Sequence, residues 1–481
     1  MPLRPLAVPA LLCFCLLALF SACSPKPPSL TGSRQATGVK VGEVTPNSAI
    51  VWMRVTRDGH RRSEGIVRRG WPQEMKTPLD PATFEGAAPG AAGRARVRYA
   101  TSEDLSDAGA TPWTTVAADG DFTVQFQLSS LSPDTRYYFS AETSSPDGEE
   151  IHQPLRGTFR TAPLPSECPD LTFTVITCQA YRSADHPDGF LIYDSMARLG
   201  PAFFVPTGDN VYYDNDDPRA RNIAMARYHW QRMYSHPKLV AFHLKAPGYW
   251  EKDDHDLYYD DCYPGMKIGA MGEFTFEQGL KVWREQTPQP SLPYRTHRWG
   301  AGLQIWLTEG REFRSPNSMP DGPGKSIWGA EQKRWLKETL LASDATWRIL
   351  INPTPIVGPD RDSKADNHAN AAYAHEGSEF RRWAAENLGG NFFIVNGDRH
   401  WQYHSVDPET GLHEFGCGPA SDVHAGGTPG ENKAYHQFHR LAGGFLSVNT
   451  RRANREDLIT FRHHDVNGAV VYEHTRSRPV R

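Results

Sequence analysis

The stretch Pro201-Ala202-Phe203-Phe204-Val205-Pro206-Thr207-Gly208-Asp209-Asn210-Val211-Tyr212 joins a short apolar run to a polar turn. An apolar run of this length is typical of a strand buried in the middle of a layered sheet. Open α/β sheets bind ligands at the carboxyl ends of their strands, so the pattern predicts that Asp209 enters a crevice there. Tyr212 can return to the same point, and a carboxylate beside a phenolate indicates a metal ion. Taken alone, the stretch also fits a Gly-Asp turn with a surface tyrosine.

Three more polar blocks follow strands or strand-like runs. They are Val175-Ile176-Thr177-Cys178-Gln179, Tyr249-Trp250-Glu251-Lys252-Asp253-Asp254-His255-Asp256 and Val395-Asn396-Gly397-Asp398-Arg399-His400. Together the blocks offer a thiolate, carboxylates, a phenolate and an imidazole, a set that suits a trivalent or borderline metal. Asp209 could bridge to a second ion held by Asp254 and Asp398, because carboxylate oxygens are typical ligands of Ca²⁺ and Mg²⁺.

The pattern of secondary structure changes near residue 165. Residues 37–162 form short runs separated by Gly, Pro, Asp and Ser turns, as in a β-sandwich that serves as a scaffold. The L-x-P-x-T-x-Y pattern that ends at Tyr137 is that of a tyrosine corner in fibronectin-like sandwiches. Further along, the predicted strands are 171–177, 201–205, 303–307, 349–351 and 392–395, the helices 190–199, 218–234, 329–341 and 380–388, and closing β-structure 446–474. This alternation predicts a layered α/β/α domain.

Bulk properties narrow the range of partners. The chain has 481 residues, of which 39% are hydrophobic, and a formal net charge of -4. This balance argues against nucleic acid as the main partner. Because the Lys and Arg residues are scattered along the sequence, any contact with a phosphate group would have to come from individual side chains. The length suffices for two domains, and we expect a monomer.

Residues 1–23 have the features of an export signal. Arg4 precedes an apolar stretch that is too short to span a bilayer comfortably. The ending Leu19-Phe20-Ser21-Ala22-Cys23 resembles a bacterial lipobox, which would make Cys23 the lipidated first residue of the mature protein. Residues 24–36 would then form an extended tether. We therefore expect an exported protein, lipid-anchored at the bacterial cell envelope on the outer membrane or periplasmic face; release after simple cleavage is the alternative.

The cysteines that follow Cys23 are too few for a disulfide scaffold. They are Cys168, Cys178, Cys262 and Cys417. Export permits disulfides. Because Cys178 is a predicted metal ligand, the other three allow at most one bridge and one free thiol, and their pairing stays open.

The order of the polar blocks resembles that of the calcineurin-like metallophosphoesterases, and more narrowly the PhoD-type alkaline phosphatases and phosphodiesterases. The matching motifs are G-D-x-x-Y at Asp209, also found in purple acid phosphatases, D-D-H at Asp253, G-D-R-H at Gly397 and the helix that begins W-G-A-E-Q at Trp328. The resemblance covers residues 165–475, and the region before them is similar to the N-terminal domain of these proteins. It implies a four-layer α/β/β/α metallophosphoesterase domain preceded by a fibronectin-like β-sandwich.

The resemblance also implies two metal sites. An Fe(III) would be held by Cys178, Asp209, Tyr212 and His400. Ca²⁺ or another divalent metal would be held by Asp209, Asp254 and Asp398. Asn352 ends a predicted strand where the superfamily often has a histidine, so it is a further candidate ligand; an asparagine that bonds a loop is the alternative.

The implied chemistry is hydrolysis of a small-molecule or polymeric phosphoester. Two cations about 3.5–4 Å apart can hold a bridging hydroxide that attacks phosphorus in line. His255 would protonate the leaving alkoxide, and Arg182 or Arg311 would bind the non-bridging oxygens. Hydrolysis of a related ester, such as a sulfate ester, is one alternative. Another is a surface protein whose degenerate hydrolase domain binds a carbohydrate or phosphate polymer.

Other polar side chains are expected to have plainer roles. The acidic residues expected in a solvated loop, or as support for the ligands, are Asp253, Asp256, Asp260 and Asp261. The histidines expected mostly at the surface or in loops are His186, His404, His424, His436 and His439.

Overall fold

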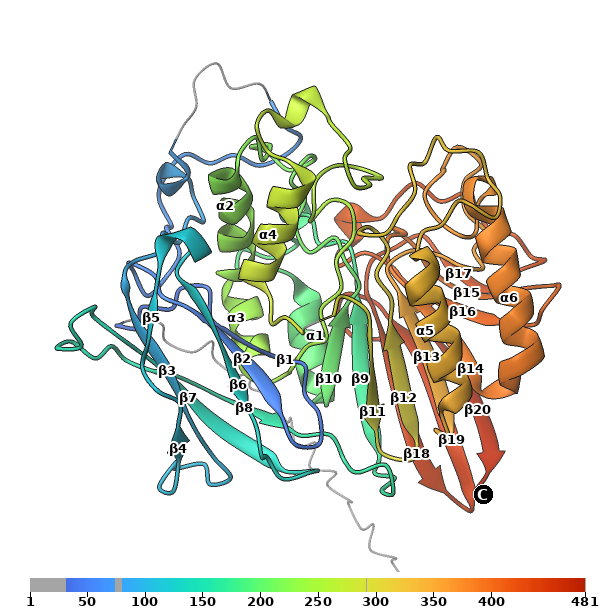
Figure 1. The fold of residues 1–481 in the computed structure, drawn as a ribbon, viewed down its shortest axis with the longest axis horizontal. Helices are drawn as coiled ribbons and strands as arrows, with labels where there is room; N and C mark the ends of the chain where they lie inside the picture. Colours follow the sequence, from blue (N-terminus) through green and yellow to red (C-terminus); the bar gives the residue numbers. More distant parts are fainter. Residues whose placement is uncertain (1–31, 74–79, 291, 481) are drawn as a thin grey trace, which may run out of the picture.

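The computed structural model describes residues 32–73, 80–290 and 292–480 (Figure 1). The predicted signal, Cys23 and most of the predicted tether lie outside the described residues. No helix in the described ranges is both long and apolar enough to cross a membrane. The cysteines within them, Cys168, Cys178, Cys262 and Cys417, are all free thiols.

The N-terminal region contains antiparallel strands in two sheets. One sheet has the order β1 (Val39–Gly42), β2 (Ala49–Arg54), β6 (Thr123–Leu128). The other has the order β4 (Gly109–Ala110), β3 (Gly93–Ala100), β7 (Arg136–Ser144), β8 (Leu155–Arg160), and β5 (Thr114–Val116) also pairs with β3. Val51, Phe126 and Phe139 share one hydrophobic core between them. The hydroxyl of Tyr137 accepts a hydrogen bond of 2.8 Å from the backbone N–H of Ser132, as the tyrosine-corner pattern predicts.

Two mixed sheets form the rest of the molecule. The first has the order β10 (Phe203–Pro206), β9 (Leu171–Ile176), β18 (Phe445–Ala453), β19 (Glu456–His464), β20 (Val470–Pro479). The second has the order β11 (Arg295–Trp299), β12 (Leu303–Leu307), β13 (Trp347–Asn352), β14 (Phe392–Asn396), β16 (His413–Cys417), β15 (Gln402–Val406), β17 (His436–Arg440). The pair β9 and β10 is parallel, and so are β12, β13 and β14.

The two sheets pack face to face between helices. Val175 and Phe461 of the first sheet share a core with Ile349 of the second. The helices α1 (Leu191–Leu199), α2 (Ile223–Tyr234), α3 (Pro237–His243) and α4 (Phe276–Gln286) cover the first sheet. On the other side, α5 (Gly329–Ala342) and α6 (Ala374–Leu388) cover the second sheet (Figure 1). The order of layers is α/β/β/α, whereas the alternation of strands and helices alone predicted α/β/α.

Most predicted elements are present, with shifted ends. The helix predicted from Pro218 begins at Ile223, because the Asn222 side chain accepts a hydrogen bond of 2.9 Å from the Met225 N–H and so caps it. The predicted helix 380–388 begins earlier, at Ala374. The sequence pattern did not predict α3, α4 or the strands β11, β15, β16 and β17.

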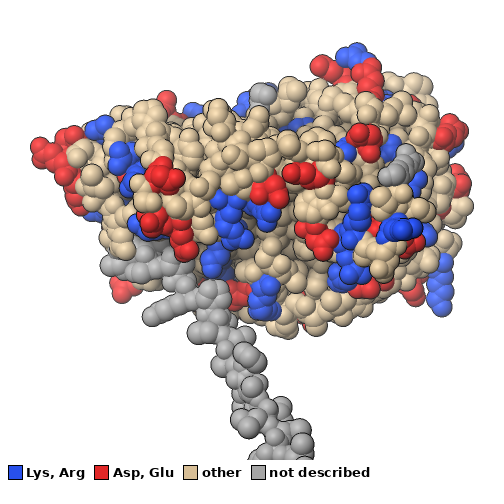
Figure 2. Space-filling model, turned by 90° about the horizontal axis from the view of Figure 1, so that it is seen from below, with Lys and Arg blue, Asp and Glu red and all other residues tan. Residues whose placement is uncertain are grey.

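Charges of both signs are spread over the surface. Figure 2 shows the molecule from below, with Lys and Arg interspersed among Asp and Glu and one group of basic side chains near the centre of that face. This mixture agrees with the near-neutral composition.

Candidate metal site

The candidate site lies where three buried strands end. Cys178 follows β9, Asp209 follows the parallel neighbour β10, and Asp398 follows β14 in the facing sheet. The backbone N–H of Asp398 donates to the Thr177 hydroxyl at 3.1 Å, which joins the two sheets at this edge. The third polar block, which includes Asp254, follows no strand; isolated bridges such as that between Thr207 and Glu251 hold it beside β10.

The three residues after the strands have an unusual backbone conformation. Their φ angles are 53° at Cys178, 54° at Asp209 and 64° at Asp398, in the left-handed region that side chains other than glycine seldom adopt. Such conformations cost about 1–3 kcal/mol each and cluster at binding and catalytic sites. The strain therefore marks this edge of the sheets as a functional site.

Two glycines let the loops approach each other closely. Gly208 has a φ of +101°, and a Cβ atom built on it would lie 2.5 Å from the Cβ of Asp253. A Cβ atom on Gly397 would lie 2.2 Å from the hydroxyl oxygen of Thr207. Any side chain at either position would push the ligand loops apart.

The four residues predicted to hold iron lie together in one group of side chains. Atoms of Cys178, Asp209 and His400 lie within 4.8 Å of one another, and the Cys178 Sγ is 3.4 Å from the Asp209 Oδ2. The Tyr212 hydroxyl donates to the same Oδ2 at 2.9 Å and lies 3.5 Å from the His400 Nε2. These side chains come from separate parts of the sequence and meet at one point.

A second group adjoins the first and shares Asp209 with it. Atoms of Asp209, Asp254 and His255 also lie within 4.8 Å of one another. Asp398 is close enough that its negative charge contributes to the raised pKa of Cys178. The predicted bridging position of Asp209 is therefore compatible with the geometry.

The electrostatics of these side chains fit a cation. Burial raises the pKa of Cys178, Asp209 and Tyr212, and a charge on Asp209 would raise the pKa of the other two further. Burial lowers the pKa of His400, which keeps its imidazole neutral. Within the described residues, the Asp209 Oδ1 is buried and accepts no hydrogen bond. Metal ions bind deprotonated thiols and carboxylates and neutral imidazoles, so a cation would displace these protons and satisfy the unpaired oxygen.

His255 is held by a carboxylate that the sequence analysis did not identify. Its Nδ1 lies 2.7 Å from the Oδ1 of Asp214, and its ring lies against Tyr212 with centroids 4.4 Å apart. Burial alone would lower the pKa of His255, but Asp214, and then the nearby Asp254 and Asp209, outweigh burial and raise it. The only signal in the sequence was the position of Asp214, two residues after Tyr212.

The arginines predicted to bind substrate lie in two different environments. Arg182 donates from Nη1 to Asp216 at 2.8 Å, and its guanidinium lies 5.7 Å from the centre of the Tyr212 ring, next to the first group. Arg311 is fully buried and donates to Asp253. The Arg311 Nη2 lies 3.7 Å from the Asp254 Oδ2 and, within the described residues, has no hydrogen-bond partner, so Arg311 lies behind the carboxylates of the acidic block.

For two further expectations the structure matches the alternative that the sequence left open. The Asn352 amide oxygen accepts from Thr308 and from the Trp328 indole, and its nitrogen donates to Thr354, so the structure does not bring it into either group. These contacts match the alternative of an asparagine that bonds a loop. In the acidic block, Asp253 and Asp256 are fully buried, whereas Asp260 is exposed and Asp261 partly so; the block is not a uniformly solvated loop.

Several histidines expected at the surface are buried. His424 lies under the first group: its Nδ1 is 3.0 Å from the Cys178 carbonyl oxygen, and its ring centroid is 4.1 Å from that of His400. His404 of β15 and His436 of β17 are also buried; both strands belong to the second sheet. Single polar residues in loops give little indication of burial, which explains why the sequence did not reveal them.

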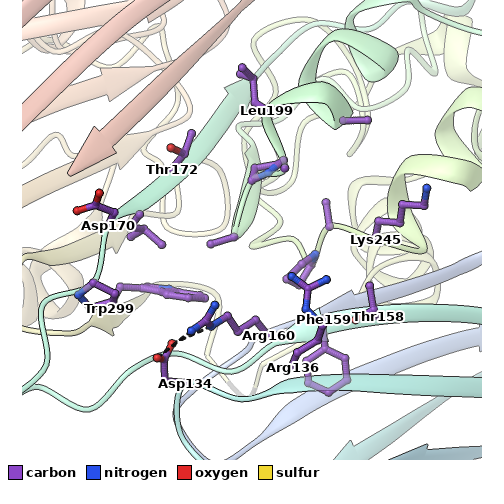
Figure 3. Close-up of a pocket in the computed structure, with 18 of the residues that line it drawn as sticks. Asp134, Arg136, Thr158, Phe159, Arg160, Asp170, Thr172, Leu199, Lys245 and Trp299 are labelled. Atoms are coloured by element: carbon purple, nitrogen blue, oxygen red, sulfur yellow. Dashed lines mark hydrogen bonds and ion pairs between the residues drawn. The ribbon is translucent and has the colours of Figure 1, made fainter. Parts of the chain in front are cut away.

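A cavity of about 690 Å³ lies at the amino ends of β9 and β10, which are the ends away from the candidate site. It is lined by residues at the start of β9 and just before β10, and by the strands β7 and β8 of the N-terminal region (Figure 3). Arg160 and Asp134 form an ion pair at 2.8 Å along its wall. None of the predicted site residues lines this cavity, so the chemistry of the site belongs to the carboxyl ends of the strands.

Comparisons with known proteins agree with this architecture. A family model described as PhoD-like phosphatase matches residues 173–476, and one described as PhoD-like phosphatase, N-terminal domain, matches residues 22–163. Alkaline phosphatase D of Bacillus subtilis (strain 168) is 25% identical over 266 residues, and the match covers 47% of this chain and 44% of that protein. The match thus spans less than half the length of this curated relative.

Solved structures resemble the whole molecule. One described as the structure of PhoD has a TM-score of 0.72 at 16% identity and covers 94% of this chain and 93% of its own. A purple acid phosphatase from yellow lupin (Lupinus luteus) seeds has a TM-score of 0.61 at 11% identity, with 92% and 74% covered. These low identities show a shared fold only, but the model matched over residues 173–476 covers more than half of the sequence. The chain belongs to the PhoD-like phosphatase family.

Proposed function

We propose that the protein hydrolyses phosphomonoesters or phosphodiesters at a pair of cations bound by the two groups of side chains. Cys178, Asp209, Tyr212 and His400 would hold Fe(III), and Asp209, Asp254 and Asp398 would hold Ca²⁺ or another divalent ion. The observation that supports this most directly is that Asp209 belongs to both groups. When bound, such a pair lowers the pKa of water and neutralises charge on the phosphoryl oxygens.

The protein's own residues would orient the substrate and deliver a proton. His255, held by Asp214 through Nδ1, can give a proton to the leaving alkoxide, a step worth about 10²–10⁴-fold in rate. Arg182 is fixed by Asp216 and by stacking over Trp71 at 4.1 Å, so its remaining N–H groups can meet a phosphoryl oxygen without a large loss of side-chain entropy.

The experiment combines metal analysis with a substrate panel. The purified full chain is tested for iron and calcium, for a visible charge-transfer band, and for turnover of aryl phosphomonoesters, aryl phosphodiesters and aryl sulfates. We expect bound iron, a coloured band and phosphoester turnover. Turnover of aryl sulfate in place of phosphoesters would favour the sulfate-ester alternative. Absence of both metal and turnover would favour the polymer-binding alternative.

A variant tests the role of His255. His255→Ala should keep its metal but slow substrates with poor leaving groups more than substrates with good ones, because only poor leaving groups depend on proton donation. The measurement is kcat/KM across a series of aryl and alkyl phosphodiesters. Equal slowing across the series would contradict proton donation by His255.

We also propose that the protein is exported and anchored through a lipid on Cys23, on the sequence features of residues 1–23. Expression of Cys23→Ala beside the wild type tests this proposal. The wild type should enter the membrane fraction and incorporate labelled palmitate, and the variant should do neither. Equal membrane recovery without labelling would contradict the lipid anchor.

A further inference from the structure

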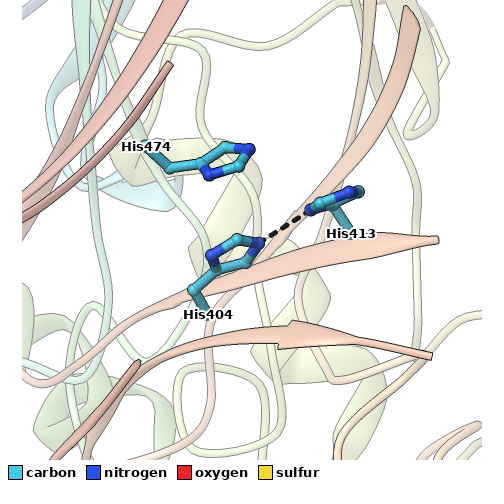
Figure 4. A group of neighbouring side chains, drawn as sticks. All are labelled: His404, His413 and His474. Atoms are coloured by element: carbon cyan, nitrogen blue, oxygen red, sulfur yellow. Dashed lines mark hydrogen bonds between the residues drawn. The ribbon is translucent and has the colours of Figure 1, made fainter. Parts of the chain in front are cut away.

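Three histidines form a compact group that the proposed reaction does not use. His404 of β15, His413 of β16 and His474 of β20 each present a ring nitrogen, and these nitrogens lie within 4.8 Å of one another. Figure 4 shows the rings of the three side chains turned toward a common centre. We name this group the histidine cluster.

The cluster lies between the two sheets, at an edge of the molecule away from the candidate site. β15 and β16 belong to the second sheet, and β20 is the last strand in the order of the first. His404 is completely buried, and its ring stacks on Phe415 with centroids 4.2 Å apart. A ligand at this point would therefore contact both sheets at once.

Within the described residues, the hydrogen bonds of the cluster leave one buried imidazole nitrogen without a partner. The His404 Nε2 lies 2.8 Å from the His413 Nδ1, and the His404 Nδ1 lies 2.8 Å from the Tyr472 hydroxyl. The His474 Nε2 is buried and, within the described residues, has no hydrogen-bond partner. The ring of His474 lies 4.7 Å from that of His404 and 5.2 Å from that of His413.

We infer that the histidine cluster is a separate metal site, away from the candidate site, which takes a borderline divalent transition metal such as Zn²⁺. Three imidazoles with one open position are a common ligand set for Zn²⁺, whereas Ca²⁺ and Mg²⁺ require oxygen ligands. The contact between His404 Nδ1 and Tyr472 matches the usual arrangement in which the second nitrogen of a ligand histidine is hydrogen-bonded. Zn–N bonds of about 2.0–2.1 Å need only a small separation of the His404 and His413 rings.

The protonation of the rings supports the site. Burial, together with the neighbouring histidines, lowers the pKa of His404 to about 2, and burial with Arg476 lowers that of His413 to about 4. Both imidazoles are therefore neutral near pH 7, the form that binds metal. Arg476 is exposed and lies 2.9 Å from the His413 Nε2, so this contact can be released when His413 binds through Nδ1.

The test is uptake of zinc by the full chain with its native metals. The wild type is dialysed against micromolar Zn²⁺ at pH 7.5 and its zinc content is measured by mass spectrometry, beside His474→Ala and the control His375→Ala. His375 is exposed on α6, so the control removes one imidazole from the surface and leaves the cluster intact. We expect one additional zinc per chain in the wild type and in the control, and a loss of affinity of at least about tenfold in His474→Ala.

A background variant separates this zinc from zinc at the candidate site. In Asp209→Asn the additional zinc should still depend on His474. Zinc should also raise the melting temperature of the wild type, because it joins β20 to the second sheet, and this shift should disappear in His474→Ala. The inference is overturned if the wild type takes up no additional zinc, or if His474→Ala binds zinc as the wild type does.

Discussion

Asp209 of the candidate site and the carboxylates Asp121 and Glu43 of the N-terminal region are all buried, but their oxygens are bonded in different ways. In the N-terminal region they are paired: Arg54 donates to both carboxylate oxygens of Asp121, and Arg295 of β11 donates to both oxygens of Glu43. At the candidate site, the Asp209 Oδ1 is buried and, within the described residues, accepts no hydrogen bond.

The difference separates structural charge from functional charge. A buried carboxylate without a partner costs free energy of folding, whereas a paired one costs little as long as its partner remains. The N-terminal pairs therefore hold the molecule together. At Asp209 the candidate site gives up some stability to keep one carboxylate oxygen free for a ligand.

Asp209→Asn gives the largest expected effect. The variant should lose iron, and its kcat/KM on an aryl phosphodiester should fall by more than roughly 100-fold. Mutation of a residue that only hydrogen-bonds to a metal ligand can already cost roughly 100-fold. In the metal-free protein, the same variant should unfold at the same or a higher urea concentration than the wild type, because it removes a buried carboxyl group of which one oxygen, within the described residues, accepts no hydrogen bond. Retention of bound iron with full turnover would show that Asp209 is not a ligand.

Arg54→Met tests the opposite arrangement. It leaves the Asp121 carboxylate buried without its guanidinium, so the free energy of unfolding should fall by about 3–5 kcal/mol in urea titrations. Arg57→Met is the matched control. Arg57 and Asp58 form an exposed pair, so this variant should change stability by less than about 1 kcal/mol. Similar losses in both variants would remove the distinction.

Glu43→Gln adds a dependence on pH. Burial would raise the pKa of Glu43, but Arg295 and His297 outweigh it and lower the pKa from 4.5 to about 2. A carboxyl group whose pKa is lowered by folding stabilises the folded state at pH values above its unfolded pKa of 4.5. That contribution is lost as the pH falls toward 2. The variant should therefore be less stable than the wild type by about 3 kcal/mol at pH 7, and the difference should shrink between pH 4.5 and 2.

The control for Glu43 is the exposed Glu103. Glu103→Gln should change the free energy of unfolding by less than about 0.5 kcal/mol at every pH. A difference between Glu43→Gln and the wild type that stays constant from pH 7 to pH 2 would contradict the role of the Glu43 charge.

Tyr137→Phe gives the smallest expected effect. It removes the acceptor of the Ser132 N–H, a neutral hydrogen bond, and should cost about 1 kcal/mol of unfolding free energy. Tyr138→Phe is the control, because successive side chains of a strand point to opposite faces. Equal effects of the two substitutions would mean that the corner hydrogen bond adds nothing measurable.

The sequence predicted the candidate site better than the layers around it. Cys178, Asp209 and Asp398 lie two or three residues after the last residue of a buried strand, so a linear motif places each of them. Pairing of β15, β16 and β17 depends instead on long-range contacts that leave no strong local pattern. Their side chains were therefore missed.

Side-chain partners were the least predictable feature. Asn352 stands at a position that suits a ligand and Arg311 at one that suits a substrate contact, yet nearby buried groups bond to the Asn352 amide and to the Arg311 Nε. The histidine cluster was also missed, because its members are separated in sequence and meet only when two sheets pack. Which polar atoms remain free depends on the packed structure and not on spacing.

The order of strands in the first sheet has a consequence for biosynthesis. β9 pairs on one side with β10, close to it in sequence, but on the other with β18, where Val175 lies opposite Leu446. Nearly the whole catalytic domain must leave the ribosome before β9 gains this second neighbour. Until then the nascent chain exposes an apolar strand edge, which is a site for aggregation unless a chaperone covers it.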